Sequence, residues 1–305
     1  MTILVDTNGL AVASLHADPY LKASFCKPDD ETKKYLYGHI MSQMLNVNRK
    51  FSKDFGQIVM CFDGSNTWRN DVFEYYKAAR KEKRKTEAIN WNLFNQYLNE
   101  FHDDVNEYLP WIAIRDDKAE ADDCIGVLTR YITKNTVQMR GVFEQSESIL
   151  IVSSDHDYKS LQVHENVQQY SKRDDTMIVS ERPKLDLLTK IMKGDEGDGV
   201  PNFKSPDDQF VTKEKRQPPV SQKLIDTFYE KMMAGEPLPF EDDIQKQRFM
   251  RNQILVDFAK IPMSIRERIV NQYTSHQGKK KNTMKMMNFF VTMGLDNFMG
   301  NINEF

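Results

Sequence analysis

Short apolar runs alternate with longer amphipathic stretches along the first half of the chain. Residues 3–5, 58–62 and 149–152 form aliphatic or β-branched runs that are short enough to be buried strands. The stretches between them have the apolar spacing of helices, at 35–48, 91–108 and 121–132. Strands that alternate with helices predict an α/β fold with a mainly parallel central sheet flanked by helices.

The pattern changes near residue 183. A polar stretch follows that is interrupted by prolines, namely Pro183, Pro201, Pro206, Pro218 and Pro219. Helical patterns then resume at 223–233, 245–260, 265–273 and 284–293. We therefore expect an α/β domain over residues 1–182 and a smaller, mainly helical domain over residues 183–305.

Acidic residues follow the predicted strands. Asp6, Asp63 and Asp155 each come directly after, or close after, one of the three apolar runs. Because open α/β sheets carry their sites beyond the carboxyl ends of the strands, we expect these side chains to meet at one edge. Further acids gather in three short motifs, KAEADD, SSDHD and KGDEGDG, and comprise Glu120, Asp122, Asp123, Asp157, Asp195 and Asp198.

So many carboxylates in one place repel one another and lose hydration unless cations neutralise them. Mg²⁺ and Mn²⁺ prefer oxygen ligands, and a pair of such ions about 3.5–4 Å apart can activate water and stabilise the leaving oxygen in phosphodiester cleavage. Each acid taken alone also fits a structural role, at a strand end, a helix N-terminus or a turn. Asp123 is the weakest candidate, because helical spacing places it on a different face from Asp122.

Composition excludes several classes of protein. The 305 residues are 40% hydrophobic and 29% charged, and no apolar run approaches the roughly 18 residues of a membrane span. The three cysteines form no CxxC pair and the six histidines are dispersed, which argues against a zinc site. The N-terminus lacks a secretory signal, so we expect a cytoplasmic protein without membrane contacts.

Other chemistries have weaker support. His156 lies near Ser153 and Ser154, but adjacency in the sequence is not the geometry of a catalytic triad. The chain has neither a GxxxxGKS or GxxxxGKT loop nor a GxGxxG loop, which removes the common nucleotide-binding folds.

A basic, aromatic segment follows Asp63. The net charge of −3 indicates no particular partner, but residues 69–85 contain seven basic and only three acidic residues. Helical spacing brings Tyr76, Lys77, Arg80 and Lys81 together, and such a combination suits a flexible single strand of nucleic acid. A solvent-exposed basic helix with no ligand is the alternative.

Taken together, the motifs resemble the structure-specific 5′-nuclease (flap endonuclease) family, and within it the phage members with ribonuclease H activity. The resemblance is carried, in this order along the chain, by LVDTN, CFDGSNTWRNDVFEYYK, KAEADD, ILIVSSDHDYKSLQ and TKIMKGDEGDGVP. It implies a PIN-like nuclease domain with two Mg²⁺ ions, which Mn²⁺ can replace, and an arch segment at about 68–90 over the site. It also implies a C-terminal domain that binds duplex DNA.

The resemblance further implies roles for individual residues. It places Asp6, Asp63, Glu120 and Asp122 around a first metal ion, and Asp155, Asp157, Asp195 and Asp198 around a second. Asp123 would support these ligands. Lys77 would be the catalytic lysine beside Asp6, Asp63, Asp122 and Asp155, and Tyr76 would stack on a base. Arg69 would contact a phosphate, with Arg80 and Lys81 as further nucleic-acid contacts.

The chain departs from the family pattern in a few places. His156 occupies a position where many members have glycine or lysine, and Gly199 one where many have asparagine. The glycine-rich duplex-binding hairpin of cellular relatives is missing after Pro201, so other residues would have to grip the duplex.

The sequence therefore predicts a Mg²⁺-dependent 5′ to 3′ exonuclease and flap endonuclease with ribonuclease H activity, which removes RNA primers and 5′ flaps during phage lagging-strand replication. Its expected substrates are RNA–DNA hybrids and flapped or forked duplex DNA. We expect a monomer in the infected cell, with a phage single-stranded DNA-binding protein and a replication clamp as partners. The alternatives are a PIN-like single-strand ribonuclease and a non-catalytic protein that binds branched DNA.

Overall fold

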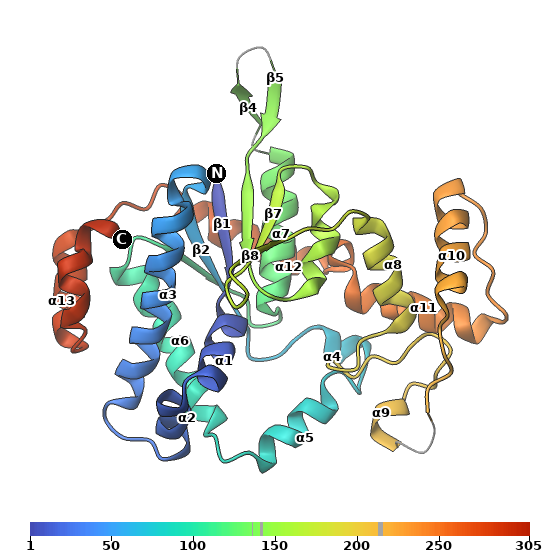
Figure 1. Ribbon diagram of the computed structural model, residues 1–305, viewed down its shortest axis with the longest axis horizontal. Coiled ribbons are helices and arrows are strands. Elements are labelled where there is room, and N and C mark those ends of the chain that lie inside the picture. The colour runs from blue at the N-terminus through green and yellow to red at the C-terminus, as the bar shows by residue number, and fades with distance from the viewer. Residues whose placement is uncertain (136, 141–142, 213–215) are drawn as a thin grey trace.

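The computed structural model describes residues 1–135, 137–140, 143–212 and 216–305, and its centre is a six-stranded sheet (Figure 1). From one edge to the other, the strands are β3 (Ile112–Arg115), β2 (Gln57–Phe62), β1 (Thr2–Asp6), β6 (Ile149–Val152), β7 (Val167–Ser171) and β8 (Thr176–Ile178). The first five are parallel and β8 is antiparallel to β7. A separate antiparallel hairpin joins β4 (Val137–Arg140) and β5 (Phe143–Ser146).

Alternating residues of the central strands face opposite sides of the sheet, and both faces are covered. Ile3 and Val5 pack on one side and Leu4 packs on the other, as the two-residue period of a strand requires. This confirms the predicted mainly parallel α/β sheet between helical layers, which also explains why the central strands are apolar throughout.

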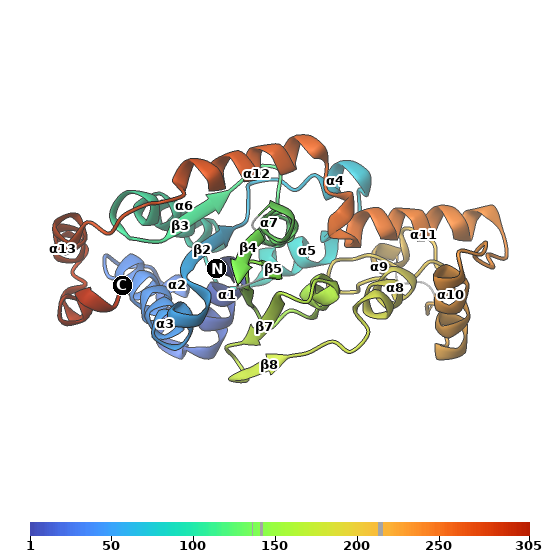
Figure 2. The same ribbon diagram turned by 90° about the horizontal axis from the view of Figure 1, so that it is seen from above.

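One helical layer packs on the face of Ile3 and Val5. It consists of α1 (Thr7–Ala17), α2 (Pro19–Cys26), α3 (Thr32–Phe55), α6 (Trp91–Tyr108), α13 (Thr283–Thr292) and the 3₁₀ helix η3 (Asp296–Glu304). The other face is covered by α7 (Ala121–Asn135), η1 (His156–Val163), η2 (Phe258–Lys260) and α12 (Met263–His276). Figure 2 shows α7 and α12 on one side of the sheet and α3 on the other.

A third group of helices lies beside the sheet. It contains α8 (Pro183–Lys193), α9 (Gln209–Thr212), α10 (Gln222–Ala234) and α11 (Asp243–Val256). Leu188, Phe203, Phe228 and Phe249 form the centre of its own small core. The chain after residue 257 then returns to the sheet, where α12 packs on α7 and β3. No helix of the described residues is long and apolar enough to cross a membrane.

The basic segment forms two short helices below the sheet edge. These are α4 (Arg69–Val72) and α5 (Ala78–Thr86), and α5 has no buried residue. Between them Phe73 and Tyr76 pack against Val200 and Leu255, so the base of this segment is anchored to the helical region.

Candidate active site at the carboxyl edge of the sheet

Asp6 ends β1 and begins α1. Its Oδ1 accepts a hydrogen bond from the Gly9 amide at 2.8 Å, and its Oδ2 accepts one from Ser153 Oγ at 3.1 Å. A Cβ at position 9 would lie only 2.4 Å from Asp6 Oδ2, so glycine there is required by this cap. Burial raises the pKa of Asp6 to about 6, and the nearby carboxylates of Asp63 and Asp155 raise it as well.

Asp63 follows β2 and is open to solvent. Its Oδ1 accepts a hydrogen bond from the Ala121 amide at 2.9 Å, at the beginning of α7, and its own amide donates to Asn8 Oδ1 at 3.0 Å. These two bonds fix the aspartate between the first turns of α1 and α7. Its position at the end of the strand agrees with the prediction from the apolar run.

Asp122 comes from the first turn of α7 and faces the same edge. Burial, followed by the carboxylates of Asp6 and Asp155, raises its pKa well above the ordinary range of an aspartate. The hydroxyl of the fully buried Tyr158 donates to Asp122 Oδ1, and the ring of Tyr158 stacks on Phe258. Asp155 lies after β6, is exposed, and accepts a hydrogen bond from the Asp157 amide at 3.0 Å.

A second group of acids lies between η1 and the loop after α8. Lys190 Nζ pairs with Asp157, and with Asp195 Oδ2 at 2.8 Å. Asp195 Oδ1 in turn accepts a hydrogen bond from the Asp198 amide at 3.1 Å. The structure therefore brings Asp157 and Asp195 together, with a lysine ammonium between them.

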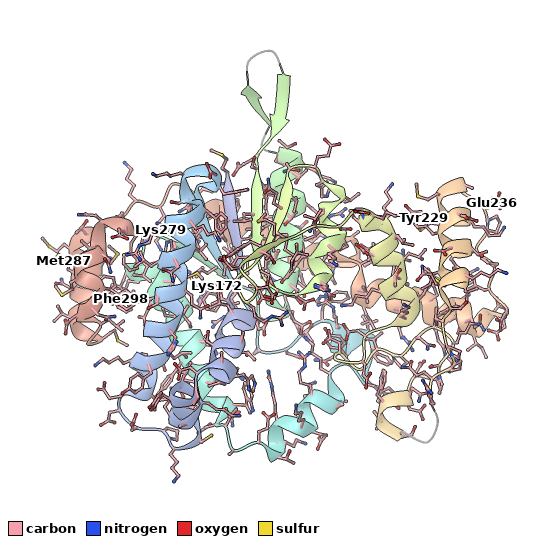
Figure 3. All side chains as sticks on the ribbon, viewed as in Figure 1. Lys172, Tyr229, Glu236, Lys279, Met287 and Phe298 are labelled. Carbon is pink, nitrogen blue, oxygen red and sulfur yellow. The ribbon has the colours of Figure 1, made fainter. Side chains whose placement is uncertain are left out.

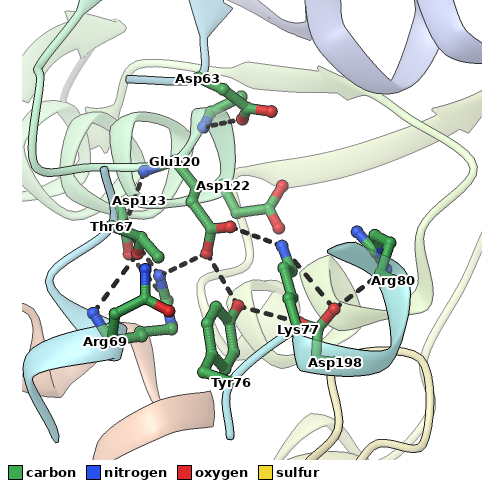
Figure 4. Close-up of polar contacts among 12 residues, drawn as sticks. Asp63, Thr67, Arg69, Tyr76, Lys77, Arg80, Glu120, Asp122, Asp123 and Asp198 are labelled. Atoms are coloured by element: carbon green, nitrogen blue, oxygen red, sulfur yellow. Dashed lines mark hydrogen bonds and ion pairs between the residues drawn. The ribbon is translucent and has the colours of Figure 1, made fainter. Parts of the chain in front are cut away.

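Tyr76 and Lys77 lie beside Glu120 and Asp198, as Figure 4 shows. Lys77 Nζ donates to Glu120 Oε1 at 2.5 Å and is 3.7 Å from Asp198 Oδ1. The Tyr76 hydroxyl lies 2.8 Å from Glu120 Oε2 and 3.0 Å from Asp198 Oδ2, so its single proton is shared between the two carboxylates. Although burial opposes the shift, Lys77 and Arg69 lower the pKa of Glu120, so this carboxylate is already neutralised by protein cations.

Tyr76 is only 3% exposed and belongs to a buried apolar cluster. In this structure its ring is covered and its hydroxyl is engaged, so stacking on a base stays a prediction that requires the ring to become exposed. The sequence pattern did not show that Tyr76 is buried. Phe73, an apolar residue three positions earlier that belongs to the same buried cluster, was the available signal.

Arg69 and Asp123 form a buried ion pair, with exposed fractions of 4% and 0%. Two guanidinium nitrogens donate to the two Asp123 oxygens at 2.8 Å each, and Arg69 Nε donates to the Leu255 carbonyl at 2.7 Å. Asp123 also accepts hydrogen bonds from Trp68 Nε1 and the Glu120 amide. These contacts fit the supporting role expected for Asp123, which holds the Glu120 backbone. The phosphate contact of Arg69 stays a prediction, because in this structure its guanidinium is fully engaged by protein partners.

Arg80 and Lys81 stay on the surface of α5. Arg80 pairs with Asp198 at 3.0 Å, and Lys81 donates to Asn70 Oδ1 at 3.2 Å. A cavity of about 470 Å³ opens beside them and reaches Asp63. Its walls carry cations from the basic segment and amides from the opposite side, including Lys77, Lys81, Arg84, Asn66, Asn95 and Asn99.

The donors at this edge suit a hard divalent cation. Among the described residues, no three Asp, Glu, His or Cys side chains lie close enough to hold one metal ion directly. Mg²⁺ usually keeps several waters and takes only one or two carboxylates, so the set of Asp6, Asp63, Asp122 and Asp155 fits Mg²⁺ or Mn²⁺ bound partly through water. Burial and the neighbouring carboxylates raise the pKa values of Asp6 and Asp122, and a bound divalent cation would favour their charged forms.

Several functional residues were missed from the sequence. Tyr158 and Ser153 orient Asp122 and Asp6, and Lys190 bridges two acids. Ser153 is the first residue of the SSDHD motif and Tyr158 follows it directly, so this motif was the available signal. Lys190 is one of three lysines in its helix, and the sequence gave no signal for it.

Comparisons with known proteins place these features in context. A family model described as the 5′-3′ exonuclease N-terminal resolvase-like domain matches residues 1–186, and one described as the C-terminal part of T4 RNase H matches residues 181–305. Ribonuclease H of Enterobacteria phage T4 is 30% identical over 275 residues, which cover 88% of this chain and 86% of that protein.

Solved structures of phage T5 proteins share the fold. A T5 5′-exonuclease with bound zinc has a TM-score of 0.57 at 15% identity, with 90% of this chain and 98% of that chain covered. A T5 flap endonuclease variant in a pseudo-enzyme-product complex with DNA and metal ions has a TM-score of 0.58 at 14% identity, with the same coverage.

Proposed function

This chain belongs to the 5′-3′ exonuclease family, and we propose that it is a Mg²⁺-dependent 5′ to 3′ exonuclease and flap endonuclease with ribonuclease H activity. Membership of this family makes the chain a nuclease. The observation that carries the finer proposal is the convergence of Asp6, Asp63, Asp122 and Asp155 beside a wall of cations from α5. Such an arrangement combines sites for divalent ions with a place for a nucleic-acid phosphate.

Bound divalent ions would supply a water nucleophile at neutral pH and stabilise the leaving oxygen. Asp6, Asp63 and Asp122 would present oxygen ligands to the first of these ions, and Asp155 to the second. Glu120, which the family pattern also places at the first ion, is paired with Lys77 in this structure. Ser153 and Tyr158 fix the carboxylates of Asp6 and Asp122 through hydrogen bonds. These two ligands are therefore already in position before the substrate binds.

Lys77 is the cation best placed to hold the scissile phosphate. Its ammonium lies among Glu120, Asp198 and Asp63, and those neighbours raise its pKa although burial opposes this. The charge is thus retained over the whole range in which the enzyme would work. A positioned cation of this kind offsets the negative charge that develops in the transition state.

The cavity of about 470 Å³ beside Asp63 would take the 5′ single strand. Lys81 and Arg84 offer phosphate contacts, while the asparagine amides opposite carry both donors and acceptors. We further propose that residues 1–182 form the nuclease domain and that the duplex-binding surface lies within residues 183–305, of which α12, α13 and η3 pack back on the nuclease sheet. The T5 relative crystallised with DNA supports a nucleic-acid substrate, and the name of the T4 relative supports RNA–DNA hybrids.

The proposed setting is lagging-strand replication of a phage, where the enzyme removes RNA primers and 5′ flaps. In that setting it would act as a monomer in the cytoplasm of the infected bacterium, next to a phage single-stranded DNA-binding protein and a replication clamp. The phage relatives support this setting.

The test uses a 5′-labelled flap duplex and an RNA–DNA hybrid, each with Mg²⁺ and with chelator. The wild type should release short 5′ products only with Mg²⁺. Asp155→Asn should lose cleavage by at least about a hundredfold while binding the flap with unchanged affinity, because it removes charge at the metal and no phosphate contact. Asp54→Asn, an exposed aspartate of α3, is the matched control and should cleave normally.

Three results would contradict the proposal. Full cleavage by Asp155→Asn would remove this carboxylate from the metal site. Cleavage of single-stranded RNA with no requirement for a duplex would instead favour a PIN-like ribonuclease, and tight flap binding without any cleavage in Mg²⁺ or Mn²⁺ would favour a non-catalytic binding protein.

A further inference from the structure

Lys190 occupies an unusual place for a lysine. Its ammonium lies between Asp157, from η1, and Asp195, from the loop after α8, and it pairs with both. The three side chains are about equally shielded, with exposed fractions of 21% for Lys190, 25% for Asp157 and 26% for Asp195. One positive charge therefore joins two carboxylates that come from separate elements.

The local backbone explains how Lys190 at the end of α8 and Asp195 in the following loop come to form an ion pair. Lys190 lies in the last turn of α8, and its carbonyl accepts a hydrogen bond from the Gly194 amide at 2.8 Å. Gly194 has φ 70°, and a Cβ there would lie 2.2 Å from the Val200 carbonyl oxygen. The chain thus reverses at this glycine and brings Asp195 back towards the lysine five residues earlier.

This arrangement differs from an ordinary surface ion pair. Lys204 offers a direct comparison, because it is 20% exposed and pairs with a single exposed carboxylate, Glu241, at 3.1 Å. Pairs of that kind join one cation to one anion and contribute little to stability. Two carboxylates from different elements around one cation are instead the donor set that a hard divalent ion requires.

We propose that Lys190 is a built-in cation that holds Asp157 and Asp195 when no divalent ion is bound there, and that its ammonium must leave before an ion can take this position. The inference rests on the proposed metal-dependent function and deepens it. Among the described residues, no lysine forms an ion pair with Asp6, Asp63 or Asp122. The nearby Lys77 pairs with Glu120 and Asp198 instead, so an ion can bind at Asp6 and Asp122 without displacing a protein cation.

The proposal has two consequences. Ion binding is ordered, with the site of Asp6 and Asp122 filled first and the site of Asp157 and Asp195 filled at higher concentration. The second site is weakened by the need to expel a positive charge. A variant without that charge should therefore bind the second ion more tightly, by at least about tenfold for one unit charge a few ångströms away.

The first experiment counts bound Mn²⁺ by the electron paramagnetic resonance signal of the free ion, with no substrate present. Wild type should show one tighter and one weaker site. Lys190→Met, which keeps the length of the side chain, should tighten the weaker site by at least about tenfold. Lys190→Arg keeps the charge and should not tighten it, and Lys204→Met, matched in exposure, should bind as the wild type does.

A second measurement uses the unmodified protein, in case Lys190→Met folds poorly. Acetic anhydride labels free amines, and mass spectrometry reads the rate at each lysine. Labelling of Lys190 should become several-fold faster when saturating Mg²⁺ releases its ammonium from Asp157 and Asp195. Labelling of Lys204 should not change with Mg²⁺.

The outcomes separate this inference from the proposed function. Equal Mn²⁺ affinities in wild type and Lys190→Met, or a labelling rate at Lys190 that Mg²⁺ leaves unchanged, would overturn the inference and make Lys190 a structural ion pair. The metal-dependent function would survive that result, because it is judged by cleavage. A wild type that binds no divalent ion and cleaves nothing would remove both.

Discussion

Replacement of Arg69 by methionine tests whether this arginine is structural or contacts the substrate. The substitution keeps an unbranched side chain of similar length but removes two hydrogen bonds to Asp123, one to Glu120 and one to the Leu255 carbonyl. Asp123 is completely buried, so its carboxylate would be left without a counter-ion. Breaking a buried pair in this way costs about 3–5 kcal/mol, a large part of the roughly 5–15 kcal/mol that stabilises a folded domain.

Urea unfolding followed by circular dichroism measures that loss. Arg69→Met should unfold at clearly lower urea than the wild type. The double variant Arg69→Met with Asp123→Asn should recover part of the loss, because a neutral amide is no buried charge and still accepts from Trp68. Arg80→Met is the control: this arginine is 44% exposed, and its loss should change stability by no more than about 1 kcal/mol.

Flap binding, measured with chelator present, separates the two roles of Arg69. A phosphate contact predicts normal stability, weaker binding and a salt dependence reduced by about one counter-ion. If Arg69→Met unfolds at the same urea concentration as the wild type but binds the flap more weakly, the role of Arg69 is a phosphate contact and not a buried ion pair.

Three further predictions concern the site and the C-terminal region. Lys77→Met should lower the single-turnover rate by more than about tenfold with little change in flap affinity, and a change in affinity alone would make Lys77 a binding residue. Tyr158→Phe removes the hydroxyl that donates to Asp122 and should lower the single-turnover rate by about tenfold at saturating substrate, while the stacked ring keeps the fold; an unchanged rate would show that Asp122 needs no such support. Burial lowers the pKa of Lys279 (labelled in Figure 3) to about 8, so the unfolded chain binds more protons between pH 8 and 10.5 and stability should rise with pH in that window. Urea unfolding at pH 8 and 10 should show a larger rise in wild type than in Lys279→Met, and equal rises would contradict the shift.

The central part of the fold follows from the sequence, whereas the edges of the sheet do not. Residues 3–5, 58–62 and 149–152 are apolar throughout because both faces of these strands are covered, and such runs are easy to recognise. β3 has only four residues, and β7 contains Gln168 and Gln169, which mask it. Gln169 is fully buried because its amide donates to the Ser153 and Asp155 carbonyls, so a polar residue in this strand holds the loop that carries the acids.

The candidate site divides in the same way. Strand ends placed Asp6, Asp63 and Asp155 at one edge, since topology alone brings the ends of parallel strands together. Burial could not be derived for Arg69 and Tyr76. Both lie in a basic and aromatic segment whose composition is that of an exposed helix, yet contacts with α11 and with the loop after α8, far along the chain, cover them.

The packing around position 199 explains why this chain has glycine where many family members have asparagine. It has φ 70°, a conformation that asparagine also adopts, so φ alone does not explain the glycine. A Cβ at this position would lie 2.9 Å from the Tyr75 carbonyl oxygen, and the neighbouring Asp198 carbonyl accepts the Lys77 amide at 2.8 Å. The missing side chain therefore lets the base of the basic segment pack directly on the loop that carries Asp195 and Asp198.

That close approach determines which part of the basic segment can adapt to a substrate. Lys77 has φ 55°, and its amide and ammonium both contact the acidic loop or Glu120, so its position is fixed at the start of α5. The rest of α5 has no buried residue and carries Lys81 and Arg84 along the cavity wall. A strand that enters the cavity therefore meets an adjustable row of cations first and a fixed one, Lys77, beside the carboxylates. If a flap strand binds as proposed, its length and base identity should be tolerated along α5, and the packing at Gly199 should set how closely its scissile phosphate approaches the acids.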